Sequence, residues 1–123
     1  MNVIEQARQA YAPTQVSVRS ERSIEAQLIS QITARLRKTS QGAGASYPQM
    51  VTALHENRRM WITMAASVAD KDNSLPQELR AQLFYLAEFT EHHTRNVIRG
   101  TADVGPLIEI NTAVIRGLNG REG

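Results

Sequence analysis

Residues 46–100 contain two helical patterns in succession and read SYPQMVTALHENRRMWITMAASVADKDNSLPQELRAQLFYLAEFTEHHTRNVIRG. Stripe residues of the first pattern recur at spacings of four and three between Met50 and Val68, and those of the second do so between Leu79 and Val97. Such spacings place the side chains on one face of an α-helix. A link of about half a dozen residues separates the patterns, and a link that short favours an antiparallel helical hairpin.

Local signals mark the ends of both helices. Ser46 and Gln49 have the spacing of a capping box, and Pro48 falls in the first turn, where its missing N–H costs nothing. The second helix begins near Pro76 and meets Gly100 as its C-terminal stop. The hairpin is therefore bounded at each end by residues suited to that position.

Two further helical stripes flank the hairpin. One helix begins at Ser20 and ends before the glycine-containing residues 40–44, and another begins around Asp103 with Pro106 in its first turn. Their apolar faces are formed by Ile24, Leu28, Ile32 and Leu36 in the first and by Leu107, Ile110, Val114 and Leu118 in the second. With the hairpin, these two helices would close a four-helix bundle.

A short additional helix can begin at Asn2. Its apolar face would consist of Val3, Ala7, Ala10 and Tyr11. Residues 12–19 contain a proline and two β-branched valines, so we interpret them as a linker. No strand pattern competes, and the predicted fold is all-α, a small bundle of about five helices with a short N-terminal helix and a four-helix core. Residues 1–123 are expected to form one domain, in which 1–19 are loosely attached and 20–118 form the bundle.

The composition of the 123-residue chain excludes several classes of protein. The absence of cysteine rules out disulfides and thiolate metal sites. Its 14 lysines and arginines are scattered among 12 acidic residues, and only residues 35–38 form a local basic cluster. This distribution argues against direct nucleic-acid binding. No apolar run has the length of a membrane span, and residues 1–6 lack the apolar run of a signal peptide. We therefore expect no membrane contact and a cytoplasmic location.

The histidines and acidic residues do not form a recognisable catalytic or metal site. Glu88 and His92 lie one turn apart, as exposed acid–base pairs on helices commonly do, and His55 belongs to another helix. Residues 70–73 resemble the start of a calcium loop, but Leu75 stands where that loop needs glycine. Phosphate-binding, dinucleotide and nucleophile motifs are also missing. We expect no enzyme, no metal and no cofactor.

Three polar residues, Asn57, His93 and Asn111, fall inside the apolar stripes. Each needs a partner when buried, because an unpaired polar group costs roughly 1–3 kcal/mol. In one interpretation they bond to one another or to a helix end and fix how the helices register. In the other they line a groove that a partner helix fills. Trp61, central in its stripe, is expected to anchor the core.

Further apolar residues flank the main stripes of the hairpin. They are Val51 and Ile62 on the first helix and Phe84, Phe89 and Ile98 on the second. A stripe wider than one neighbour can cover implies a second neighbour. The other helices of the bundle could be that neighbour, or part of the surface could remain open for a protein partner. These five residues are the candidate partner-binding residues.

Several short runs resemble a known family in their order and spacing. They are residues 54–61 (LHENRRMW), 70–76 (DKDNSLP), 79–83 (LRAQL), 93–97 (HTRNV) with Gly100, and 106–111 (PLIEIN). Together they are similar to the flagellar biosynthesis protein FlaF, a small family of alphaproteobacterial flagellar systems. The resemblance covers residues 46–118 most strongly, and the family pattern is matched at Asn57, Arg58, Trp61, His93 and Asn111.

This resemblance implies a role in supplying flagellin. It implies a cytosolic chaperone that binds flagellin, through the client's terminal helices, and promotes its production and secretion. An alternative is a post-transcriptional regulator of flagellin synthesis that acts with a second small regulator, FlbT, which is also a possible partner. Direct RNA contact is disfavoured, because it usually needs a concentrated basic face with stacking aromatic residues.

Overall fold

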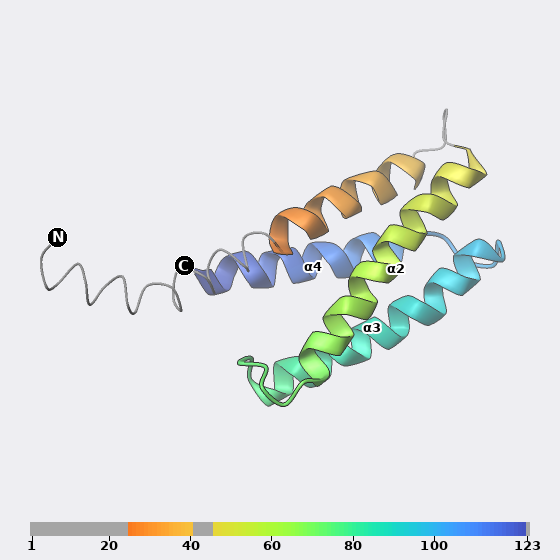
Figure 1. Cartoon of the computed structure of the whole chain (residues 1–123). Coiled ribbons are helices and arrows are strands. Elements are labelled where there is room, and N and C mark those ends of the chain that lie inside the picture. Colours follow the sequence, from red (N-terminus) through yellow and green to blue (C-terminus); the bar gives the residue numbers. More distant parts are fainter. Residues whose placement is uncertain (1–24, 41–45, 123) are drawn as a thin grey trace, which may run out of the picture.

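The computed structural model describes residues 25–40 and 46–122, which form four α-helices and no strand (Figure 1). The first helix spans residues 25–40. It is followed by α2 (Tyr47–Ala69), α3 (Gln77–Ile98) and α4 (Gly105–Glu122). The all-helical prediction and its four-helix core are confirmed for this part of the chain. The predicted helix from Asn2 and the linker 12–19 lie outside the described residues, as does the side chain of Leu118.

The predicted capping box begins α2. The Ser46 hydroxyl accepts a hydrogen bond from the Gln49 N–H at 3.3 Å, and the Gln49 side-chain oxygen accepts one from the Ser46 N–H at 3.1 Å. Pro48 lies in the first turn, where no backbone N–H is required. The start of α2 is therefore fixed by local chemistry alone.

Gly100 ends α3 in the way that the sequence predicts. Its φ is +81°, a left-handed conformation that glycine adopts without a Cβ clash. The Gly100 N–H donates to the Val97 carbonyl at 3.0 Å and the Thr101 N–H to the Asn96 carbonyl at 2.9 Å. These bonds satisfy carbonyl groups at the end of the helix.

Asp103 caps α4 instead of beginning it. Its carboxylate accepts a hydrogen bond from the Gly105 N–H at 2.8 Å, and the helix starts at Gly105. The sequence placed the start around Asp103, two residues early. A carboxylate that bonds to a nearby backbone N–H favours a turn over a helical residue, which accounts for the shift.

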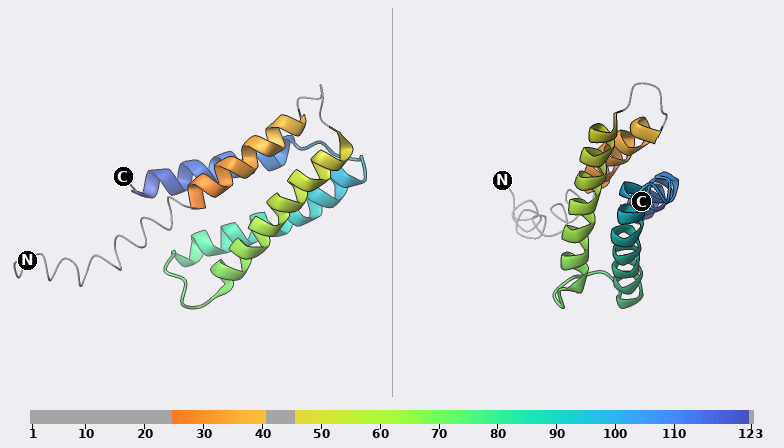
Figure 2. Two further views of the ribbon diagram at one scale, coloured as in Figure 1. Left: turned by 45° about the horizontal axis from the view of Figure 1, so that its top comes forward. Right: turned by 90° about the vertical axis from the view of Figure 1, so that its right-hand side faces the viewer.

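The helices α2 and α3 pack side by side as the predicted antiparallel hairpin (Figures 1 and 2). Contacts along the hairpin show that the two helices run in opposite directions. The Tyr47 hydroxyl, at the start of α2, donates to the carbonyl of Ile98 at the end of α3, 3.2 Å away. Arg80, near the start of α3, donates to the carbonyl of Val68 at 2.8 Å and to that of Asp70 at 2.7 Å. The first of these carbonyls lies in the last turn of α2, where a cation is favourable.

Two apolar clusters make up the core. The first joins the ends of the helices near residue 40 and consists of Leu36, Ala53, Leu54, Val97, Val104 and Leu107. The second lies further along the bundle and consists of Ile29, Ile32, Met60, Trp61, Ala87 and Val114. The core is therefore divided lengthwise, with aliphatic residues dominating both halves.

Candidate binding groove

An apolar groove with a volume of about 880 Å³ lies at one end of the bundle. All four described helices and the α2–α3 loop contribute to it. The aliphatic lining consists of Leu28, Ile29, Ile32, Met60, Met64, Val68, Leu75, Leu79, Leu83, Leu86 and Val114. Exposed polar residues such as Arg59, Thr63 and Gln82 also line it. An apolar surface with polar residues beside it is the arrangement that accepts an amphipathic helix.

The groove is open because the helices diverge in pairs. Helix 25–40 lies with α4, and α2 lies with α3 (Figures 1 and 2). The pairs meet where α2 begins and α3 ends, and they separate toward the opposite ends. Leu36, at the meeting end, is fully buried, and Ile29, near the open end, is only 1% exposed, whereas its neighbour Leu28 is 46% exposed. Near the open end, the side of the helix on which a residue lies therefore decides whether its side chain remains open.

The floor of the groove belongs to the core. Ile29, Ile32, Met60 and Val114 line the groove and are also members of the second apolar cluster. Their positions are held by packing inside the folded chain, so a ligand meets a surface that is already formed. A preformed site loses less conformational entropy when it binds.

A chain of buried polar side chains crosses the bundle beside this floor. The Trp61 indole N–H donates to the Asn111 side-chain oxygen at 2.9 Å, and the Asn111 amide donates to the Asn57 side-chain oxygen at 2.8 Å. Asn57 and Asn111 are fully buried, and Trp61 is 1% exposed. The structure thus places these residues in bonds to one another, away from the groove. They connect α2 to α4.

Two buried side-chain polar atoms have no hydrogen-bond partner among the described residues. They are the Asn57 Nδ2 and the Thr90 Oγ1. The Thr90 carbonyl does accept a bond from the Thr94 hydroxyl, at 2.6 Å. Buried positions on α2 and on α3 therefore contain polar groups whose hydrogen-bonding capacity is incompletely used.

His93 is not buried as the sequence predicts. It is only partly buried, and its Nε2 lies 2.7 Å from the carbonyl oxygen of Asp103, in the link between α3 and α4. Its ring stacks on Phe89, with 5.4 Å between centroids and 15° between planes. His93 lies close to the end of α3, where the ring reaches this link instead of the interior. It therefore ties α3 to the start of α4 and takes no part in the Asn57–Asn111 pair.

The candidate partner-binding residues do not line the groove as the described residues define it. Ile62, Phe84, Phe89 and Ile98 are exposed, and Val51 is partly exposed. Helical spacing puts Phe84 and Ile98 on the flank of α3 that carries Glu91, whereas Phe89 is on the other flank with His93. The five residues therefore do not form one continuous surface.

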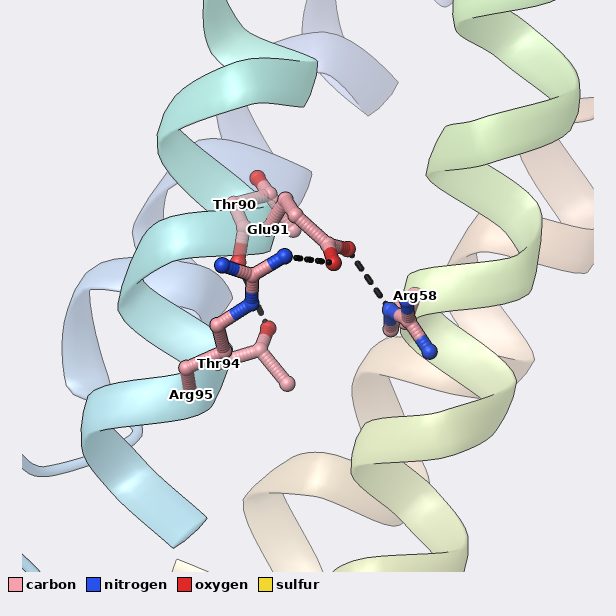
Figure 3. A network of polar contacts seen from close by, with 5 residues as sticks. All are labelled: Arg58, Thr90, Glu91, Thr94 and Arg95. Atoms are coloured by element: carbon pink, nitrogen blue, oxygen red, sulfur yellow. Dashed lines mark hydrogen bonds and ion pairs between the residues drawn. The ribbon is translucent and has the colours of Figure 1, made fainter. Parts of the chain in front are cut away.

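An ion-pair network crosses the middle of the hairpin (Figure 3). The Arg58 Nε donates to Glu91 at 2.6 Å, and the Arg95 guanidinium donates to the other oxygen of Glu91 at 3.2 Å. The hydrogen bond from Arg58 is the main cause that lowers the pKa of Glu91; partial burial opposes it. The same hydrogen bond, together with the charge of Glu91, raises the pKa of Arg58. Because these side chains are largely or partly exposed, the network positions the helices more than it stabilises them.

Sequence reasoning missed the groove because its lining was assigned to the core. Leu28, Leu79 and Leu83 were all placed in stripes that neighbouring helices would cover. In the structure Leu28 is exposed, and Leu79 and Leu83 are only partly buried. The helical stripe is the signal that finds these residues. The sequence pattern does not determine the angle at which the helices cross, and that angle affects how far these residues are covered.

The described residues contain no helix long and apolar enough to cross a membrane. They also contain no group of three or more histidine, aspartate or glutamate side chains that could hold a metal ion. The fold and the site together define a small helical bundle with a preformed apolar groove at one end.

The chain belongs to the flagellar protein FlaF family, whose family model matches residues 7–118. The resemblance seen in the sequence is thereby confirmed, and with it a role in the flagellum. No curated protein and no solved structure matches the chain.

Proposed function

We propose that this protein is a cytosolic flagellin chaperone that binds an amphipathic terminal helix of flagellin in the groove and catalyses nothing. The observation that carries the proposal is the apolar groove, whose floor is part of the folded core. A family with a flagellar role supplies the context. Flagellin before export is the client that this context favours, because an unassembled subunit must keep its apolar helix faces covered.

The dimensions of the groove suit one helix. Along α2 the lining runs from His55 to Val68, which at 1.5 Å per residue is about 20 Å. A client helix of about four turns would match that length and could place side chains at positions i, i+4, i+7 and i+11 on the floor. The polar residues in the lining, such as Arg59 and Gln82, would face the client's polar side.

The charges of the described residues favour this proposal over direct binding to flagellin message. Arg58 and Arg95 share Glu91, and Arg35 bonds to Glu56. Arginines engaged in this way do not form the concentrated basic face that RNA requires. A regulatory effect, with or without FlbT, would then follow from capture of flagellin.

The test is co-purification with the organism's flagellin, followed by size-exclusion chromatography with light scattering. Leu28→Glu is the diagnostic variant, because Leu28 lines the groove and is already 46% exposed, so the folded chain tolerates the change. Ile62→Glu is the matched control, since Ile62 is 52% exposed and outside the groove. A carboxylate in the apolar groove should weaken binding at least about tenfold, and the control should not.

Three results would contradict the proposal. Flagellin that fails to bind, even with FlbT present, would remove the chaperone function. Binding that survives removal of flagellin's terminal helices would show that these helices are not the segment that the groove binds. Binding that is weakened by Ile62→Glu and not by Leu28→Glu would move the site to the flank of α2 that carries Ile62, one of the five candidate partner-binding residues predicted from the sequence.

A further inference from the structure

The chain enters the described structure at the open end of the groove. Glu25 is the first described residue, and it already lines the groove. One turn later, Leu28 presents an apolar side chain that the described helices leave 46% exposed. The residues that precede Glu25 are therefore attached directly beside an open apolar surface.

Residues 2–11 have the length and pattern of an occupant. As a helix of ten residues they would be about 15 Å long, close to the length that helix 25–40 contributes between Glu25 and Arg35. Their apolar face, formed by Val3, Ala7, Ala10 and Tyr11, has the spacing of a helix that packs on one side. The sequence gives this face no partner elsewhere.

The linker is long enough for the chain to turn back. Residues 12–19 can span up to about 27 Å when extended. If helix 25–40 continues back to residue 20, as the sequence predicts, it adds about 7 Å beyond Glu25. The linker exceeds that distance several times, so residues 2–11 can reach the groove of their own chain.

We propose that residues 2–11 bind as a helix in the groove of the same chain and occupy it until a client helix displaces them. The self-contact follows from the groove and the segment alone; displacement by flagellin rests on the proposed function. The segment is suited to be displaced, because two of its four apolar contacts are alanine, and alanine side chains bury little surface.

Tethering sets the strength of this competition. A short flexible linker gives an effective concentration in the millimolar range. A segment that binds with a Kd of about 0.1 mM in trans would then fill the groove about nine-tenths of the time and weaken client binding about tenfold. The groove would be covered when no client is present and still available to one that binds more tightly.

The absence of native cysteine allows a direct test in the full chain. Ala7→Cys is combined with Met64→Cys, which places the second thiol in the groove, or with Ile62→Cys, which places it on the far side of the same helix. Mild oxidation is followed by intact mass and light scattering. The Met64→Cys pair should form an intramolecular disulfide at least about tenfold faster than the Ile62→Cys pair, because only the former holds its two thiols together.

Equal rates for the two pairs would overturn the self-contact. A disulfide that forms mainly between chains would overturn it as well and would assign the groove to the segment of a second copy. Circular dichroism of the reduced variants checks that both pairs retain the helical fold.

A second measurement separates this inference from the chaperone function. Val3→Asp with Tyr11→Asp should strengthen flagellin binding by the full chain about tenfold, because the competitor is removed. A fast Met64→Cys disulfide without any flagellin binding would leave the self-contact standing and refute the chaperone. Flagellin binding that Val3→Asp and Tyr11→Asp leave unchanged or weaken would refute the competition.

Discussion

Asn111→Leu tests whether the buried polar chain stabilises the bundle. Leucine has the same branching and the same number of side-chain heavy atoms as asparagine, so the change removes hydrogen bonds without opening a cavity. It leaves the Trp61 N–H unpaired and takes away the one bond that the Asn57 side chain makes among the described residues. Two buried groups without partners cost roughly 1–3 kcal/mol each, and the added aliphatic surface returns about 1 kcal/mol. The expected loss is about 3 kcal/mol of unfolding free energy, a large part of the 5–15 kcal/mol typical of a domain.

Urea unfolding followed by circular dichroism measures that loss. Fluorescence gives a second, local signal, because Trp61 is the single tryptophan of the chain. Thr112→Val is the control: it is the next residue on α4, and its hydroxyl bonds only within the helix, to the Ile108 carbonyl at 2.8 Å. The control should change the unfolding free energy by less than about 1 kcal/mol.

A double variant tests whether the two buried amides act as a pair. Asn57→Leu together with Asn111→Leu removes both amides and leaves the Trp61 N–H as the unpaired group. Its loss should be about 1–2 kcal/mol smaller than the sum of the two single losses, since the amides act as a pair. Additive losses would show that the two amides do not act as a pair. An Asn111→Leu variant within about 0.5 kcal/mol of the parent would show that the buried bonds do not stabilise the fold.

Three smaller predictions concern local features. Ser46→Ala removes the N-cap of α2 and should cost about 1 kcal/mol in urea unfolding, with Ser40→Ala, whose hydroxyl bonds to a carbonyl at the end of its own helix, as control. Gly100→Ala should cost about 1 kcal/mol through its positive φ, because nothing lies within 4 Å of the added methyl group; no loss would exclude the backbone cause. Because pairing lowers the pKa of Glu91, the unfolded chain binds its proton first, and the stabilisation, present above about pH 4.5, is lost as the pH falls through the lowered pKa. Unfolding from pH 6 to pH 2 should therefore show a steeper acid loss for the parent than for Glu91→Gln; equal slopes would refute it.

The helix ends could be predicted because their causes are local. The capping box at Ser46 and Gln49 and the positive φ of Gly100 each involve residues a few positions apart. The start of α4 was misplaced for a local reason too: Asp103 can begin a helix or cap one, and the sequence alone does not decide between the two. Such errors are confined to a residue or two.

The pairing of polar residues could be predicted only as one of two alternatives. Helical spacing placed Asn57 and Asn111 on apolar faces, but whether two such faces meet at the same height depends on how the helices slide past each other. In the structure they meet, and the Asn111 amide bonds to Asn57. His93 shares the same kind of stripe and yet lies at the end of α3, against the Asp103 carbonyl. Nothing in the spacing separates these two outcomes.

The groove follows from a property that no stripe contains. Leu28 and Leu36 belong to one helical stripe but lie about 80° apart around the helix. Leu36 is fully buried and Ile29 is 1% exposed, whereas Leu28 is 46% exposed. A pattern records which face of a helix is apolar, whereas the angle between helices records how much of that face finds a neighbour. A helix can therefore present a wider apolar face than its bundle covers. The uncovered part of that face remains exposed until a ligand covers it, and an exposed apolar surface of this kind is where a small helical protein can bind a partner.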